Sequence, residues 1–476
     1  MKDINMNKGG NDRYDLIVIG AGSAGFSASI TAADAGKRVA LVGHGTIGGT
    51  CVNVGCVPSK AMIRAAEAIH GAQAARRFPG LSGHAQVDDW RTLIQSKNDL
   101  VATLRQKKYA DLLPEYAGVD YIDDGPAQLV KGGVTVGGRT LTARKLIIAT
   151  GGRPVLPTID GIKDIGALDS TSLLELETLP KSLIFIGAGY IGAELAQMMS
   201  RMGVKVTLVT RSHLLPGAEP DVSAALTDVF TAEGITLLTG LSYDSVRRDA
   251  DGVTLRVMQD GKPVEVTAEY LVSTAGRRAN TSGMGLEELG VQTNAHGAIV
   301  IGEDMQTSVS GIYAAGDVTD RDQFVYMAAY GAKLAVKNAV LGEDNRYDNS
   351  AMPWVVFSDP QVAGVGLSEQ QARDAGFDVK TSVVPLDQVP RALAARDTRG
   401  LIKLVADTAT DKLLGGQIIA PEGSDTIQTL VMALKFGMTT KDLGATIFPY
   451  LTTVEGLKLA AQTFDKDVAK LSCCAG

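Results

Sequence analysis

The feature that most constrains this chain is a pattern that occurs twice: a short apolar strand, a glycine-rich turn and a helix. In the first copy, residues 14–19 (YDLIVI) precede the turn at residues 20–25 (GAGSAG) and an alanine-rich helix that ends near residue 36. Glycines at this spacing let the backbone approach a pyrophosphate at the helix N-terminus. A second apolar strand at residues 38–42 supplies the context that a lone G-x-G-x-x-G lacks. The pattern therefore predicts a dinucleotide-binding unit.

The second copy predicts a second nucleotide. A strand at residues 182–186 leads into GAGYIG at residues 187–192, a helix to residue 202 and a strand at residues 205–209. Two such units suit a flavin that is reduced by a nicotinamide. The second strand is followed by Thr210 and Arg211, with no acid. An arginine there accommodates a 2′-phosphate, so we expect NADPH; the alternative for Arg211 is a solvated surface cation. The predicted NADPH contacts are Gly187, Gly189, Gly192 and Arg211.

The first unit departs from the usual pattern at its ribose position. An acid commonly lies about 20 residues after the first glycine and holds a ribose hydroxyl. Here that position is Gly43, followed by His44. The nucleotide site stays predicted, but its ribose contact has no assigned partner.

Two cysteines lie soon after the first unit, within the segment GGTCVNVGCVPSK at residues 48–60. In an unbroken helix, residues five apart are separated by roughly 7.5 Å along the axis, whereas a disulfide needs Cα atoms about 4.4–6.8 Å apart. If Cys51 and Cys56 pair, the turn between them must be distorted, and Gly55 eases that distortion. The position predicts a redox pair within reach of a bound cofactor; two buried structural thiols are the alternative.

Size and charge exclude several classes of function. A chain of 476 residues predicts two to four domains, and its net charge of −7 gives no reason to expect nucleic-acid binding. No run of about 18 apolar residues indicates a membrane span. Residues 1–12 are polar, lack the apolar core of a signal peptide and are expected to be a disordered lead-in. Four cysteines in so long a chain are not a secreted disulfide framework, so we expect a cytoplasmic protein.

The order of these motifs resembles that of the flavin-dependent pyridine nucleotide–disulfide oxidoreductases along nearly the whole chain. Besides the two fingerprints and the cysteine segment, ATG at residues 149–151 and the Gly-Asp ending of TSVSGIYAAGD at residues 307–317 fall in family order. The resemblance implies an α/β fold with two Rossmann-like dinucleotide-binding domains and a C-terminal α+β dimerisation domain. The implied domains are FAD-binding at 13–155 and 276–350, NADPH-binding at 156–275, and dimerisation at 351–476 with a Cys-Cys tail.

The resemblance also implies residue roles. It makes Cys56 the thiol that faces the flavin. From their positions in the sequence, Lys60 is expected to lie near the flavin and to pair with Glu194. Tyr190 interrupts the second glycine loop and is expected to form a wall or gate of the nicotinamide pocket, with simple packing as the alternative. One subunit's C-terminal domain completes the active site of the other in a homodimer. The implied FAD contacts are Gly20, Gly22, Ala24, Gly25, Gly45, Gly49, Thr50, Lys60, Ala127, Asp317 and Val325.

The C-terminal stretch indicates a branch of this family. Members that act on organic disulfides carry His-Pro-Thr-x-x-Glu, but here residues 450–455 read YLTTVE, and no histidine lies beyond His296. Tyr450, with an ordinary pKa of about 10, is a poor proton carrier at neutral pH. The chain ends instead in Cys473 and Cys474, soft ligands that suit Hg(II). This combination resembles the mercuric reductases, which also often carry an N-terminal metal-binding domain that this sequence is expected to lack.

The expected reaction is reduction of Hg(II), presented as a thiol complex, to Hg(0). Its predicted catalytic residues are Cys51, Cys56, Lys60, Tyr190, Glu194, Tyr450, Cys473 and Cys474, the four cysteines being the metal ligands. Two alternatives are a thioredoxin-reductase-like enzyme whose terminal cysteines relay electrons to a disulfide, and a thiol protein that only sequesters soft metals. Absence of the histidine argues against the first, and bound flavin would argue against the second.

Overall fold

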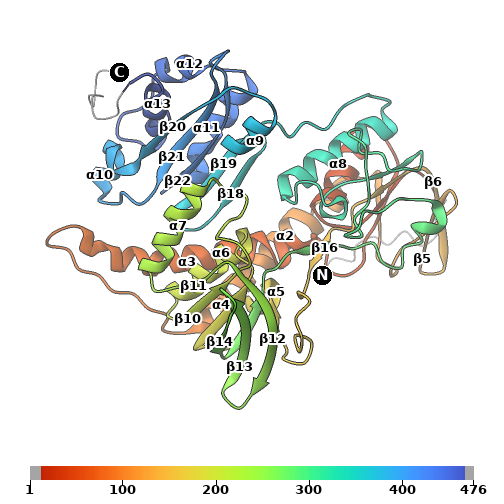
Figure 1. Ribbon diagram of the computed structural model, residues 1–476. Helices are drawn as coiled ribbons and strands as arrows, with labels where there is room; N and C mark the ends of the chain where they lie inside the picture. Colours follow the sequence, from red (N-terminus) through yellow and green to blue (C-terminus); the bar gives the residue numbers. More distant parts are fainter. Residues whose placement is uncertain (1–11, 467–476) are drawn as a thin grey trace. The chain divides into compact units, whose positions relative to one another are not determined.

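The computed structural model describes residues 12–466, which divide into two compact units (Figure 1). The first comprises residues 12–61, 91–155 and 276–347; the second comprises residues 62–90, 156–275 and 348–466. Both units mix helices with sheets, as the sequence predicts. No helix within residues 12–466 has the length and apolar character needed to cross a membrane.

The first unit is built on a largely parallel sheet. Strand β1 (Arg13–Ile19) lies between β2 (Val39–Val42) and β6 (Arg139–Ile148), and β3 (Val119–Ile122) extends the sheet beyond β2. All these neighbours run parallel, so their carboxyl ends share one edge, where nucleotides bind in such folds. The remaining elements are α1 (Ser23–Asp34), α2 (Gly49–Asn53), α4 (Trp90–Arg105), β4 (Gln128–Val130), β5 (Gly133–Val136), β7 (Gly152–Pro154), β16 (Arg277–Ala279), β17 (Ile312–Ala314) and α8 (Val325–Val340).

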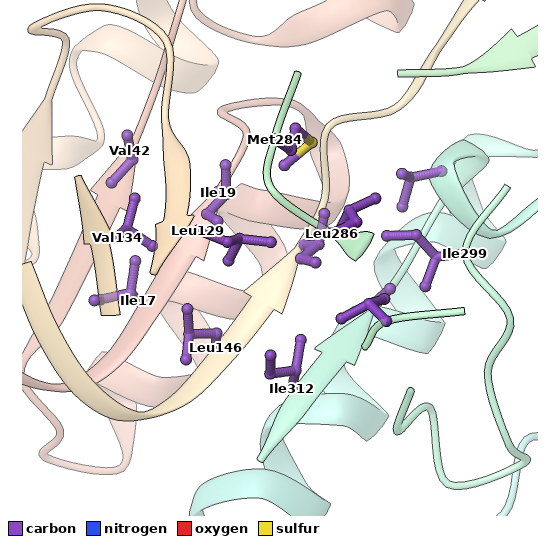
Figure 2. Close-up of a cluster of buried hydrophobic side chains, with 14 of the residues drawn as sticks. Ile17, Ile19, Val42, Leu129, Val134, Leu146, Met284, Leu286, Ile299 and Ile312 are labelled. Carbon is purple, nitrogen blue, oxygen red and sulfur yellow. The ribbon is translucent and has the colours of Figure 1, made fainter. Parts of the chain in front are cut away.

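The core of this unit joins segments that are far apart in the sequence. Figure 2 shows Ile17 of β1, Leu146 of β6 and Ile312 of β17 in one apolar cluster. The last four residues of β1 are all buried, because helices or loops cover both faces of a parallel sheet. The chain leaves this sheet after β6 and therefore returns to it at β17, far along the sequence.

The second unit contains another parallel sheet and a three-stranded antiparallel one. The parallel order is β11-β10-β9-β15-β8, and the predicted strands at 182–186 and 205–209 are confirmed as β9 (Ser182–Ile186) and β10 (Lys205–Val209). The other elements of this region are β8 (Leu168–Asp169), α5 (Ser170–Leu173), α6 (Tyr190–Arg201), α7 (Pro220–Ala232), β11 (Thr236–Leu238), β12 (Leu241–Asp249), β13 (Gly252–Gln259), β14 (Lys262–Ala268) and β15 (Tyr270–Ser273). Helix α3 (Cys56–Ala74) begins in the first unit and continues into the second.

The C-terminal region of the second unit carries an antiparallel sheet in the order β18-β19-β22-β21-β20. The α+β character is as predicted, but the sequence pattern misses β19, whose residues QVAGVG include two glycines that weaken a strand signal. The described part of this region has five α-helices. The elements are β18 (Pro353–Val356), β19 (Gln361–Gly366), α9 (Glu369–Asp374), β20 (Val379–Pro385), α10 (Pro390–Ala395), β21 (Leu401–Asp407), β22 (Leu413–Ala420), α11 (Gly423–Lys435), α12 (Thr440–Ala445) and α13 (Glu455–Gln462).

Candidate active site

The first glycine turn has the backbone geometry that a pyrophosphate requires. Gly20 has φ of +112°, and a Cβ there would lie 2.3 Å from the carbonyl oxygen of Ala149. A Cβ on Gly25 would lie 1.7 Å from the carbonyl oxygen of Gly20. Helix α1 begins at Ser23, and no side chain caps its first turn, which leaves N–H groups available to an anionic ligand.

Some of the other predicted flavin contacts lie around this turn. Gly49 opens α2, and a Cβ there would meet the Cα of Gly22 at 2.7 Å, so α2 packs directly on the turn. Ala24 is buried, and a Cβ on Gly316 would approach both Ala24 and Ala328 of α8, so the segment before Asp317 reaches α1 as well. Asp317 is 3.4 Å from the Arg277 guanidinium Nε.

The remaining predicted flavin contacts are spread over several loops and helices of the first unit. Gly45 lies in the exposed loop after β2, Thr50 in the first turn of α2, and Val325 at the start of α8. Ala127, which lies between β3 and β4 in the sequence, packs against the apolar cluster of the first unit. The glycine turn, α2 and the β17–α8 connection nevertheless fit the pyrophosphate and sugar portions of a dinucleotide such as FAD.

The two inner cysteines flank a break between helices. Helix α2 ends at Asn53 and α3 begins at Cys56, so Cys51 and Cys56 lie on different helices. A Cβ on Gly55 would lie 3.0 Å from the Thr50 carbonyl oxygen and 3.3 Å from the Cys51 Cα. The distortion expected from the spacing is present, and Gly55 allows it. Both cysteines are free thiols in the structure.

The thiol pair is electrostatically asymmetric. A hydrogen bond with Cys56, burial and the negative charge of Cys56 raise the pKa of the Cys51 thiol well above its usual range. The positive charge of Lys60 acts in the opposite direction. Cys56 opens α3, where the helix dipole favours a thiolate. The arrangement therefore favours a proton on Cys51 and a negative charge on Cys56.

Tyr109 is a neighbour of this site that sequence reasoning missed. It lies in the π-helical turn Gln106–Ala110, and its hydroxyl is 3.4 Å from that of Ser23 in the first glycine turn. Burial first, and then the charges of Cys51 and Cys56, raise its pKa. The only sequence signal was an aromatic residue at the end of a polar helix, which is too common to single out.

The second glycine turn repeats the geometry of the first. Gly187 has φ of +102°, and a Cβ there would lie 2.7 Å from the carbonyl oxygen of Thr274. A Cβ on Gly192 would lie 2.0 Å from the carbonyl oxygen of Gly187, whereas the space beside Gly189 is open. Gly189 is the uncapped N-terminus of α6. These residues fit a second dinucleotide.

Tyr190 begins α6 and stacks on Trp354, with ring centroids 5.5 Å apart and planes 16° apart. Burial raises the pKa of Tyr190 to about 12. Trp354 in turn lies against Gly364, where a Cβ would overlap its ring. Sequence reasoning missed Trp354, because its partner Gly364 lies in β19, a strand that the sequence pattern does not predict.

Two further predicted residues lie on elements of the second unit. Arg211 comes directly after Thr210 at the end of β10 and is exposed, at the edge where a nucleotide ribose would lie. Glu194 of α6 is 5% exposed, and its Oε1 accepts a 2.9 Å hydrogen bond from the N–H of Phe357. The pairing of Glu194 with Lys60 stays a prediction.

The C-terminal stretch is described only in part. Tyr450 is exposed, whereas Glu455 is buried and accepts a 3.1 Å hydrogen bond from the N–H of Leu451. Cys473 and Cys474 lie outside the described residues. Within residues 12–466, no three side chains of His, Cys, Asp or Glu gather to hold a metal ion.

Comparison with protein families decides the assignment that this geometry supports. The family model described as pyridine nucleotide-disulphide oxidoreductase matches residues 14–335. The model of that family's dimerisation domain matches residues 352–461. The chain belongs to this family. Membership implies FAD and a nicotinamide nucleotide as cofactors, and the dimerisation domain implies a homodimer.

Several curated relatives, at 40–46% identity, are named mercuric reductase. The mercuric reductase of Bacillus cereus is 46% identical over 475 residues, which cover 100% of this chain and 75% of the relative. That of Streptomyces lividans is 45% identical over 469 residues, covering 97% of this chain and 98% of the relative. Among solved structures, the Cu(II) complex of the HOCl-induced flavoprotein disulfide reductase RclA from Escherichia coli has a TM-score of 0.83 at 29% identity, covering 95% of this chain and 99% of that one.

Proposed function

We propose that this protein is a mercuric reductase, an NADPH-dependent flavoprotein that reduces thiol-bound Hg(II) to Hg(0). The observation that carries the proposal is the thiol pair Cys51 and Cys56, set in a chain that is 40–46% identical to proteins of that name. The sequence supports the same function, because the C-terminal domain contains no histidine to protonate an organic thiol. We place the activity in the cytoplasm, where thiols are kept reduced.

The residues act on the metal by exchanging thiolate ligands. Cys473 and Cys474 of one subunit take Hg(II) from two small thiols, which leave with protons, and pass it to Cys51 and Cys56 of the other subunit. Cys56 accepts the metal first, because burial and the hydrogen bond between the two thiols favour the proton on Cys51. Bound FAD supplies the route by which two electrons from NADPH reach Hg(II). Hg(0) then leaves, since it binds thiolates poorly, and the freed thiolates recover one proton.

Other residues position the nicotinamide and exclude water. Tyr190, stacked on Trp354, forms an aromatic wall beside the second glycine turn. Arg211 supplies a positive charge for the 2′-phosphate that distinguishes NADPH from NADH. Tyr450 lines the metal pocket without carrying protons, since a phenol stays protonated near neutral pH.

The test is NADPH oxidation by the flavin-loaded homodimer, with Hg(II) in excess small thiol. We expect turnover that depends on Hg(II), loss of that turnover in Cys51→Ser and Cys56→Ser, and a large loss in the double variant Cys473→Ala/Cys474→Ala. Reduction of ferricyanide by NADPH is the control, because it needs the flavin and nicotinamide but no thiol. Absence of Hg(II)-dependent turnover in an enzyme that still reduces ferricyanide would refute the proposal. Turnover with an organic disulfide instead would favour a thioredoxin-reductase-like function.

A further inference from the structure

The missing acid at the ribose position of the first unit has a structural explanation. Gly43 directly follows β2 and is buried, and its N–H donates a 2.9 Å hydrogen bond to the Ile122 carbonyl oxygen of β3. A Cβ at Gly43 would lie 2.4 Å from the hydroxyl oxygen of Tyr121. Any side chain at position 43 would therefore overlap the Tyr121 phenol. The absence of an acid and the presence of this tyrosine are two parts of one arrangement.

The register of the sheet places the Tyr121 hydroxyl at the nucleotide edge. Strands β2 and β3 run parallel, with Leu41 opposite Tyr121 and Val42 opposite Ile122. Val42, which Figure 2 shows beside Ile19, is the last residue of its strand. The phenol thus reaches across to the carboxyl end of β2, where the acid of a dinucleotide-binding unit meets the ribose.

The phenol oxygen also has the right chemistry for this position. Its 2.4 Å separation from the Cβ position at Gly43 is comparable with the distance between the Cβ of an aspartate and its own carboxylate oxygens. Tyr121 is half-buried, and within residues 12–466 its hydroxyl has no protein hydrogen-bond partner. Burial and the charge of Asp123 raise its pKa to about 12, so the group stays a neutral hydroxyl at physiological pH. A neutral hydroxyl can both donate to and accept from a ribose hydroxyl.

We propose that Tyr121 replaces the customary acid and hydrogen-bonds the 2′-hydroxyl of the adenosine ribose of the flavin nucleotide in the first site. Gly43 is required because only a residue without a side chain leaves room for the phenol. This inference rests on flavin binding in the first unit and is independent of the reaction that the enzyme catalyses. Two other side chains near this corner, His44 and Asp123, are exposed and are the competing candidates for the same contact.

The experiment measures the dissociation constant of the full-length, FAD-free chain for FAD and for its 2′-deoxyadenosine analogue, by quenching of flavin fluorescence. The wild type is expected to prefer FAD, and Tyr121→Phe to bind FAD about five- to tenfold more weakly, as loss of one hydrogen bond predicts. Binding of the deoxy analogue should be unchanged in Tyr121→Phe. The matched control is Tyr14→Phe, which removes a phenol hydroxyl at the opposite end of the same sheet.

Three further variants test whether Tyr121, rather than a neighbouring side chain, makes the ribose contact. Gly43→Ala should displace the phenol and weaken FAD binding even when position 121 is still tyrosine, with thermal unfolding reporting whether the chain folds. His44→Ala and Asp123→Asn should retain the preference for FAD. The proposal is wrong if Tyr121→Phe keeps that preference, or if it weakens both ligands equally. It is also wrong if His44→Ala or Asp123→Asn alone abolishes the preference.

Discussion

The two glycine turns of this protein share one backbone design, but the residues after the second strand of each unit differ. In both turns, the last glycine packs against the carbonyl of the first, so that a Cβ would lie 1.7 Å away in one turn and 2.0 Å in the other. After the second strand, however, the first unit has Gly43 beneath a tyrosine and the second has the exposed Arg211. The shared part serves the pyrophosphate that both nucleotides contain. The part that differs lies where one nucleotide is distinguished from another.

The largest effect is expected when one methyl group is added to each glycine turn. This change tests whether the two turns bind their nucleotides separately. Gly25→Ala is expected to prevent flavin binding, since its Cβ would overlap the Gly20 carbonyl oxygen. Gly192→Ala is expected to leave flavin bound but to weaken reduction by NADPH about 100-fold. Flavin absorbance and stopped-flow reduction measure the two losses. Gly71→Ala in α3, where a Cβ has open space, is the control. Loss of flavin from Gly192→Ala would show that the turns do not act separately.

An intermediate effect is expected from Arg211→Glu. Replacing the cation with a carboxylate removes a charged contact to the 2′-phosphate and adds repulsion, so kcat/KM for NADPH should fall about 10- to 100-fold. The value for NADH, which lacks that phosphate, should change little. Lys205→Glu, at the other end of β10, is the matched control. Equal losses for both nucleotides would mean that Arg211 is only a surface cation.

The smallest effect concerns Tyr190, whose pKa is raised to about 12 by burial. Because that pKa lies above neutrality, the phenol stays protonated from about pH 6 to 9 and contributes no titration there. Tyr190→Phe should keep the pH profile of flavin reduction and change its rate less than about twofold, since stacking on Trp354 remains. Tyr190→Ala loses the stack and should raise KM for NADPH. An inflection that is present in the wild-type profile and lost in Tyr190→Phe would show that the hydroxyl carries a proton in the reaction.

The sequence predicted those parts of the molecule that depend on local pattern. Strands β9 and β10 match the predicted residues, and the break at Gly55 agrees with the distortion that the cysteine spacing requires. Such features require only neighbouring residues, because backbone geometry and side-chain periodicity are local properties. The glycine turns were predicted for the same reason.

The contacts that the sequence could not show depend on residues brought together by the sheets. Tyr121 covers Gly43 only because β2 and β3 pair in one register, although the two residues are far apart along the chain. Tyr109 approaches the first turn through a π-helical segment, and Trp354 meets Tyr190 from another part of the second unit. Long-range contacts of this kind leave no periodic signal, so each required coordinates.

The interruption between α2 and α3 has a consequence for how the inner sulfurs work. Because Cys51 belongs to α2 and Cys56 to α3, the distance between their sulfur atoms is not set by the rise of a single helix. A covalent sulfur–sulfur bond needs a short gap, and a metal held between two sulfurs needs a longer one. Two sulfur atoms carried by separate helices are therefore not restricted to the one spacing that a continuous helix would impose.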